Sequence, residues 1–269
     1  MTRRPFIVDL GWRDEGLALL GAASAPQLEL AGVCAFDRPS RDVASESARR
    51  LGLALGAPIA AGMGRLLGAP SEAPGSEGAA AHVLVRDLAT ARAGELEVLA
   101  LGPLSNLARA ILSRPEVARL VRRVYVAGGA HAGGDASPAA ERSILADPEA
   151  AKVVFESGIP IAMIGLDVEE RARLSFDEAR SLRAGLEFAA EARDEGYVRG
   201  LGLATLLSAL DEGVISFREC HVDVEIRGEL TYGKTVCDVD NPRRGRPNAK
   251  VALGLDRARF LEAARRLLS

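Results

Sequence analysis

The chain has 269 residues, of which 48% are hydrophobic, and a formal net charge of −3. This length and composition suit a single domain with a sizeable core. The small net charge gives no electrostatic reason to expect nucleic acid or a membrane surface as a partner. The 3 cysteines are too few and too scattered for a disulfide framework or a cysteine-rich zinc site, so we expect a reducing, cytoplasmic setting.

Strand and helix patterns alternate along the first half of the chain. Residues 1–5 lead directly into an apolar strand, and no apolar run is long enough to predict a signal peptide or a membrane span. In chain order the pattern predicts a strand at 6–8, a helix at 16–23, a strand at 28–36, a helix at 41–55, a short strand at 58–61, a loop at 64–78, a helix at 79–92, a strand at 96–101, a helix at 107–113 and a strand at 124–127.

Two helix starts further along carry capping signals. Asp147-Pro148-Glu149 places a cap, a proline and an early acid in the order that opens a helix. Ser175, with Glu178 three residues later, fits a capping box. Both signals predict helices that begin at defined residues.

The pattern changes toward the C-terminus. It predicts a strand at 161–166, a mostly helical stretch at 187–211, strands at 221–226, 235–240 and 250–255, and a closing helix at 257–268. The whole chain therefore predicts an α/β fold with a mostly parallel central sheet flanked by helices and a β-rich C-terminal addition. With no repeat or linker visible, we expect one domain covering residues 1–269.

Residues 7–19 (IVDLGWRDEGLAL) carry the clearest functional signal. They predict a buried strand, a tight turn and a helix that opens on Asp14 and Glu15. Open α/β sheets bind ligands outside the carboxyl ends of their strands, so these carboxylates could face a ligand. They could equally form an acidic first turn that complements the helix dipole. Asp9, at the strand end, could bind a ligand or cap the turn.

Five blocks in the chain resemble, in the correct order, the inosine–uridine-preferring nucleoside hydrolase family. That family opens with Asp-Thr-Asp-Pro-Gly-x-Asp-Asp before an apolar helix. The blocks are the N-terminal strand–turn–helix, 102–108 (GPLSNLA), 126–130 (VAGGA), 140–151 (AERSILADPEAA) and the stretch from 222–225 (VDVE) to 233–236 (GKTV). Together they cover nearly the whole chain.

The resemblance implies hydrolysis of an N-glycosidic bond through an oxocarbenium-like sugar. It also implies a calcium ion, held by aspartates and one backbone carbonyl, that binds the ribose diol and the attacking water. Such an ion takes about 6–8 oxygen ligands at roughly 2.3–2.6 Å. Carried over by register, the catalytic residues are Asp9, Asp14 and Glu15, and the metal ligands, if a metal is retained, are Asp9, Glu15 and the carbonyl of Val126.

The N-terminal block departs from the family pattern at its metal ligands. Glu15 replaces the second aspartate of the helix-opening pair. When this block is aligned to the family pattern without a gap, the earlier metal aspartate of the family falls on Leu10. With a gap of one residue in the alignment it falls on Asp9. Gly11-Trp12 replaces the Pro-Gly turn in either register, and Trp12 could fill the space of the metal and sugar or stack on a base.

The last metal aspartate of the family, which sits in a His-Asp pair, also has no counterpart. Counting back from residue 222 without gaps places Leu201 and Gly202 at that pair. The asparagine after the second strand falls on Asp37 or Arg38. The calcium set therefore departs from the family at two or three positions.

A set of polar residues is expected to surround the sugar. The two sugar-binding asparagines of the family fall on Asp135 and Ser143, and the glutamate between them is kept as Glu141. His131, in the same Gly-rich loop, could protonate a leaving base or be solvated. The expected substrate-binding residues are Asp14, Asp135, Glu141, Ser143, His131 and Trp12.

Three functional hypotheses follow from these observations. The first is a nucleoside hydrolase that acts on a ribonucleoside or related compound, with or without calcium. The second is a catalytically degenerate homologue that binds a nucleoside-like ligand or acts as a structural protein. The third is altered, metal-free chemistry on the same fold. The resemblance also implies a homo-oligomer, and a small nucleoside-like molecule is the expected ligand.

Overall fold

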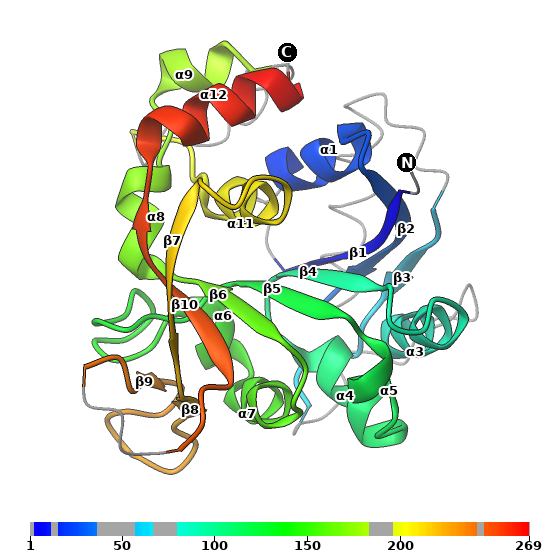
Figure 1. The fold of residues 1–269 in the computed structure, drawn as a ribbon. Helices are drawn as coiled ribbons and strands as arrows, with labels where there is room; N and C mark the ends of the chain where they lie inside the picture. The colour runs from blue at the N-terminus through cyan, green and yellow to red at the C-terminus, as the bar shows by residue number, and fades with distance from the viewer. Residues whose placement is uncertain are drawn as a thin grey trace.

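The structure is a computed structural model that describes residues 3–11, 16–36, 57–66, 80–182, 196–240 and 245–268 (Figure 1). Within these ranges eight strands form one sheet, in the order β3-β2-β1-β4-β5-β6-β10-β7. Its strands are β1 (Arg4–Leu10), β2 (Leu28–Ala35), β3 (Ile59–Ala61), β4 (Glu97–Leu101), β5 (Arg123–Ala127), β6 (Ile161–Ile164), β7 (Ile215–Cys220) and β10 (Ala249–Leu255).

Helices cover both faces of this sheet (Figure 1). On one face lie α1 (Gly16–Ser24), α8 (Leu166–Ala172), α9 (Phe176–Arg180), α11 (Leu201–Leu210) and α12 (Arg257–Leu268). On the other lie α3 (Ala81–Ala91), α4 (Ser105–Ser113), α5 (Val117–Leu120), α6 (Arg142–Ala146) and α7 (Pro148–Glu156). All ladder contacts are parallel except the pairing of β10 with β7. This confirms the predicted mainly parallel sheet flanked by helices, whose central strands are apolar because both faces are buried.

Most predicted elements in the described ranges are present, with three kinds of correction. The strand β7 was not predicted, because residues 215–220 fall between the predicted helical stretch and the first predicted C-terminal strand. The short helices α5, α6 and α8 were not predicted, because four to seven residues are too few to show a helical period. Residues 196–200, predicted as helix, are not helical, and α11 begins only at Leu201. The helix predicted at 41–55 lies outside the described residues.

The C-terminal strands divide between two sheets. β10 joins the main sheet beside β6 in parallel, and β7 pairs with β10 as the antiparallel edge. The strands β8 (Val222–Val224) and β9 (Thr235–Cys237) form a separate antiparallel pair. The C-terminal strands β10 and β7 therefore extend the main sheet, whereas β8 and β9 form a separate hairpin.

The strand order reverses between β1 and β4. From β1 the chain builds outward through β2 and β3 on one side, and β4 then begins the other side. Ligands of open α/β sheets bind in the crevice outside the carboxyl ends of the strands at such a reversal. The fold therefore places the end of β1, with Asp9, beside the expected ligand crevice. None of the helices in the described ranges is long and apolar enough to cross a bilayer.

A fully buried carboxylate fixes the start of α7. Asp147 caps this helix by accepting a hydrogen bond from the backbone N–H of Ala150, as the sequence predicted. Its other oxygen accepts hydrogen bonds from the Ser105 hydroxyl and the Leu66 backbone N–H. One side chain therefore joins α7 to α4 and to the segment after β3.

Asp147→Ala is expected to lower the free energy of unfolding by about 1–3 kcal/mol, because it removes a cap and leaves buried donors without an acceptor. Urea unfolding measures the change. Glu156→Ala, an exposed change at the other end of α7, is the control and should cost less than about 1 kcal/mol. Equal losses in the two variants would contradict the role of Asp147.

Candidate functional site

Asp9 occupies the carboxyl end of β1 at the strand-order reversal. Asp9 is only 3% exposed, and its Oδ1 accepts a hydrogen bond of 2.9 Å from the Asn106 side-chain amide. The same amide nitrogen donates to the carbonyl of Ala35 at the end of β2. Asn106 therefore connects α4 to the ends of two strands.

Burial changes the acidity of Asp9. Desolvation raises the pKa of its carboxyl group from 3.8 to about 7, and the hydrogen bond from Asn106 opposes part of that rise. A carboxyl group with a pKa near neutrality can exist in both protonation states at physiological pH. This is the property that a general base or acid needs.

Glu141 is the second buried carboxylate at this edge of the sheet. One oxygen accepts from the backbone N–H of Ser143, and the other from those of Gly129 and Ile144. The side chain therefore caps α6 and ties it to the end of β5. Burial raises the pKa of Glu141, the three backbone donors oppose the rise, and the charge of Asp135 adds to it.

A glycine is required where Glu141 meets the end of β5. Gly128 has φ of +159°, and a Cβ there would lie 2.9 Å from the Glu141 carboxylate. Gly129 has φ of +79°, a left-handed conformation that favours glycine. The Gly-Gly pair of the sequence motif therefore lets the backbone approach this carboxylate.

A small cavity of about 20 Å³ lies beside Glu141, over the carboxyl ends of β5 and β6. A cavity of this size holds roughly one water molecule. Two further residues expected at the sugar, Asp135 and Ser143, line it. The full lining is Ala127, Asp135, Glu141, Arg142, Ser143, Leu166, Glu169, Arg199, Leu201 and Gly202.

An arginine from the segment before α11 points into this cavity. Nη1 of Arg199 lies 3.2 Å from Oε1 of Glu169 on α8 and 3.9 Å from Oδ2 of Asp135. Asp135 also accepts a hydrogen bond from the backbone N–H of Arg142. The cavity therefore contains an internal ion-pair cluster of two carboxylates around one guanidinium.

Not all of the residues expected at the site reach this cavity. His131 is absent from its lining, and its Nε2 lies 3.9 Å from Oδ2 of Asp240. Val126 is fully buried within β5. Trp12, Asp14 and Glu15, like Asp37 and Arg38, lie outside the described residues.

The described residues do not fit the calcium ion that the resemblance implies. Across the described ranges, no three His, Cys, Asp or Glu side chains are grouped to hold a metal. β4 separates β1 from β5, so the backbones at Asp9 and Val126 lie about 10 Å apart. Asp9 turns toward Asn106 on α4, and Leu201 and Gly202 line the cavity without a ligating side chain. We therefore derive no step through a metal.

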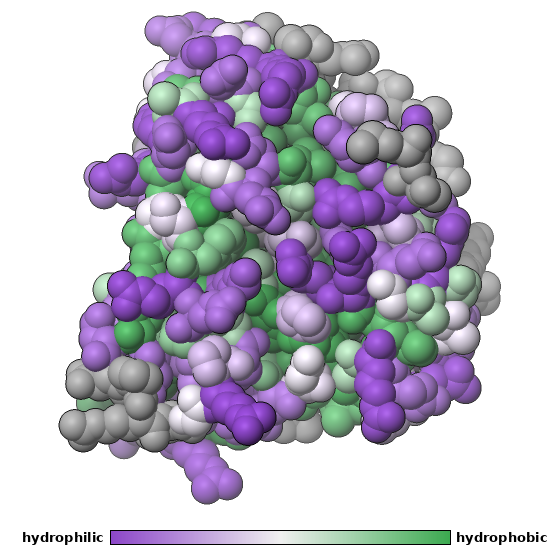
Figure 2. Space-filling view, in the orientation of Figure 1, coloured by the Kyte–Doolittle hydropathy of each residue, from purple (hydrophilic) through white to green (hydrophobic). Residues whose placement is uncertain are grey.

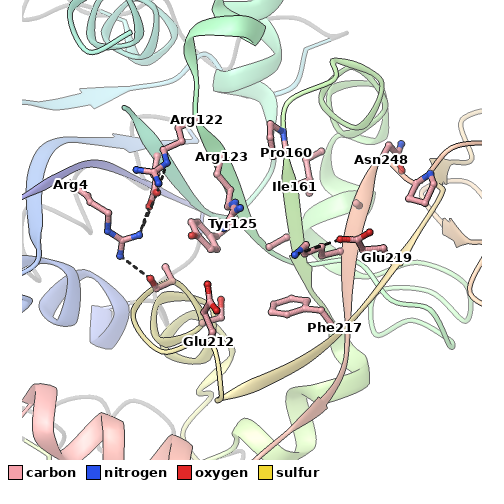
Figure 3. Close-up of a pocket in the computed structure, with 17 residues that line it drawn as sticks. Arg4, Arg122, Arg123, Tyr125, Pro160, Ile161, Glu212, Phe217, Glu219 and Asn248 are labelled. Carbon is pink, nitrogen blue, oxygen red and sulfur yellow. Dashed lines mark hydrogen bonds and ion pairs between the residues drawn. The ribbon is translucent and has the colours of Figure 1, made fainter. Parts of the chain in front are cut away.

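A larger groove of about 520 Å³ opens at the opposite edge of the sheet (Figure 3). It lies at the amino ends of β4, β5, β6 and β10, beside α11 and β7. Arg4, Glu97 and Arg122 form an ion-pair group on one wall, and Tyr125 and Phe217 supply aromatic surface. The same side of the molecule is largely hydrophilic, with hydrophobic residues showing between (Figure 2). We place the candidate site at the opposite edge of the sheet, formed by the carboxyl ends of the parallel strands, because such sheets bind ligands there. This edge is called the carboxyl edge below.

Two members of the carboxyl-edge cluster were missed from the sequence. Glu169 lies on α8, a helix too short to show a period, and Arg199 lies in a stretch predicted as helix. The sequence feature that comes nearest to marking Arg199 is the neighbouring Gly200, where a Cβ would overlap the carbonyl of Ala172. Such a glycine marks a close backbone approach, but the sequence does not show to what.

Comparison with known proteins gives a consistent result. Residues 7–262 match the sequence profile of the inosine-uridine preferring nucleoside hydrolases. The non-specific ribonucleoside hydrolase RihC of Salmonella enteritidis PT4 is 36% identical over 188 residues, which cover 65% of this chain and 61% of that protein. RihC of Escherichia coli O9:H4 is 36% identical over 189 residues, covering 66% of this chain and 62% of its own length. The chain thus spans about three fifths of the length of these curated relatives.

Solved structures show the same fold. A plant nucleoside hydrolase, the PpNRh1 enzyme, superposes with a TM-score of 0.86 at 23% identity and covers 100% of both chains. A purine-preferring ribonucleoside hydrolase from Gardnerella vaginalis gives a TM-score of 0.84 at 22% identity, covering 98% of each chain. At this level of identity the likeness concerns the fold.

The raised pKa of Asp9 predicts a pH dependence of stability. Between pH 3.8 and about 7 the folded state keeps a proton that the unfolded state releases. The free energy of unfolding should therefore fall as pH rises through this window, by at most about 4 kcal/mol at roughly 1.4 kcal/mol per pKa unit. Urea unfolding of the wild type and Asp9→Asn measures it, and the variant should give a flatter profile.

Asp87→Asn, on the exposed side of α3, is the matched control and should keep the wild-type slope. A wild-type slope in Asp9→Asn would show that another group titrates in this window.

Proposed function

The chain belongs to the inosine-uridine preferring nucleoside hydrolase family, and from this premise we propose that it hydrolyses the N-glycosidic bond of a ribonucleoside or a related ribosyl compound. The curated relatives that it resembles are ribonucleoside hydrolases by name. The proposed ligand is a small nucleoside-like molecule bound at the carboxyl edge of the sheet.

The observation that carries this proposal is the buried Asp9 at the strand-order reversal. With a pKa of about 7, a substantial fraction of this carboxyl group is ionised at neutral pH. The ionised form could accept a proton from an attacking water, and the Asn106 amide would hold the carboxylate in place. Glu15, outside the described residues, is the alternative base.

The residues around the cavity supply groups suited to sugar hydroxyls. An ionised carboxylate offers about four acceptor positions. Glu141 uses three of them for backbone N–H groups, which leaves one for a hydroxyl. Asp135 and Ser143 line the same cavity, and the family register adds Asp14 to this set. Their arrangement supports a polyhydroxylated ligand such as ribose.

A second candidate function is ligand binding without hydrolysis. The observation that favours it is the size of the cavity, about 20 Å³, which holds roughly one water and not a sugar. The Arg199 side chain takes part of the space beside Glu141 and Asp135. A family member that has lost its metal ligands could keep a binding pocket while losing turnover.

Two further expectations accompany the proposed function. The resemblance predicts a homo-oligomer, and the cysteine usage predicts the cytoplasm. Size-exclusion chromatography with light scattering addresses the first, and cell fractionation the second.

Ribose release from a panel of purine and pyrimidine nucleosides tests the proposal, with millimolar calcium and with chelator. The wild type should release ribose from at least one nucleoside. Asp9→Asn should lower kcat by about 10²–10⁴-fold, the usual contribution of general base catalysis. Asp87→Asn, far from the carboxyl edge, is the control and should keep wild-type kcat.

Absence of ribose release from every nucleoside in both conditions would exclude hydrolysis of the compounds tested. A nucleoside that then raises the melting temperature without turnover would support the binding function, because a ligand of the native state stabilises it.

A further inference from the structure

We propose that the guanidinium of Arg199 is a fixed cation that pairs Asp135 and Glu169 at the carboxyl-edge cavity, so that the pocket keeps its charge balance without a divalent metal. This inference rests on the proposed function in one respect: it takes the cavity beside Glu141 as the sugar pocket. The charge relations within the cavity hold whether or not the protein turns over substrate.

The backbone on both sides of Arg199 is fixed. Val198 forms an antiparallel bridge with Leu174, with N–H···O distances of 2.8 and 2.9 Å in the two directions. Gly200 packs against the carbonyl of Ala172, where a Cβ would not fit. The segment is thereby held against α8 and the turn after it. The backbone that carries the Arg199 side chain is therefore fixed by the packing of the fold.

The guanidinium forms ion pairs with two carboxylates of the cavity. Its Nη1 lies 3.2 Å from Glu169, whose side chain is 8% exposed, and 3.9 Å from Asp135. Glu141 lines the same cavity and is also buried. Three carboxylates around one small space repel one another unless a cation lies among them. Arg199 supplies such a cation permanently, because a guanidinium does not lose its proton in proteins. Arg142 also lines the cavity, but the ion pairs described here with Asp135 and Glu169 are those of Arg199.

The same guanidinium would oppose a calcium ion at this place. A metal bound in this cavity would have to share the carboxylates of Asp135 and Glu169 with Arg199, and the two cations would repel each other. Asp9 and Val126, which the family register makes metal ligands, do not line this cavity. Leu201 and Gly202, at the register of the family's last metal aspartate, line the cavity without offering a ligand. The register position of the family's last metal aspartate and the Arg199 guanidinium therefore lie at one cavity.

Calcium titration calorimetry and thermal unfolding test the inference, with millimolar calcium chloride and with chelator. The wild type should give no saturable heat and one melting temperature in both buffers. Arg199→Met removes the cation and keeps an apolar side chain of similar length. It should melt several degrees lower in chelator, and calcium should restore part of the loss.

Two variants serve as matched controls. Arg199→Lys keeps a positive charge and should stay insensitive to calcium. Arg259→Met removes another arginine that is paired with a carboxylate, Asp211, but that lies on the surface, on α12. It should change the melting temperature little and gain no response to calcium.

Saturable calcium binding by the wild type, or calcium-dependent stabilisation of it, would overturn the inference. So would an Arg199→Met protein that melts as the wild type in chelator, or one that calcium does not stabilise. Should Arg199→Met not fold, calcium titration of the wild type and Arg199→Lys decides the question. A failure to release ribose would count against the proposed hydrolysis and leave the calcium result unchanged.

Discussion

The carboxylate of Glu141 is the interaction on which the arrangement of the carboxyl edge depends. It accepts hydrogen bonds from the backbone at the end of β5 and at the start of α6, and so joins a strand to the helix that follows it. A buried carboxylate is costly unless its oxygens are satisfied, and three backbone donors meet this requirement. Gly128 and Gly129 make the approach possible. Glu141 thus both holds the loop in place and contributes a carboxyl group to the lining of the cavity.

The fold and a metal site place different demands on the sequence. The sheet is held by apolar contacts spread over many residues on both faces, and such packing tolerates substitution. A metal site depends on a few oxygens that must converge within a narrow range of distances. Replacement of two or three of them can remove the ion while the sheet and helices stay. Arg199 and Glu169 show one way in which the remaining carboxylates can be balanced.

The cavity beside Glu141 and the groove of Figure 3 lie at opposite edges of one sheet and differ in character. The amino-edge groove is the larger, but its charged residues Arg4, Glu97 and Arg122 are paired with one another (Figure 3). The carboxyl edge has less room and contains the two buried acids whose pKa values are raised, Asp9 and Glu141. In a parallel sheet the strand ends and following loops gather there, which concentrates polar groups from distant parts of the chain. Size alone therefore does not identify the site.

The sequence by itself determined most of the strands, though not β7, as well as most of the longer helices, the Asp147 and Ser175 caps, and the order of family blocks. These features are local, because periodicity and capping involve residues within a few positions of one another. Only the tertiary structure decided that Asp9 meets Asn106 and that Arg199 meets Glu169 and Asp135. These partners are 30 to 97 residues apart, and no local pattern links them. The raised pKa of Asp9 follows from burial, which depends on how the whole sheet and its helices pack.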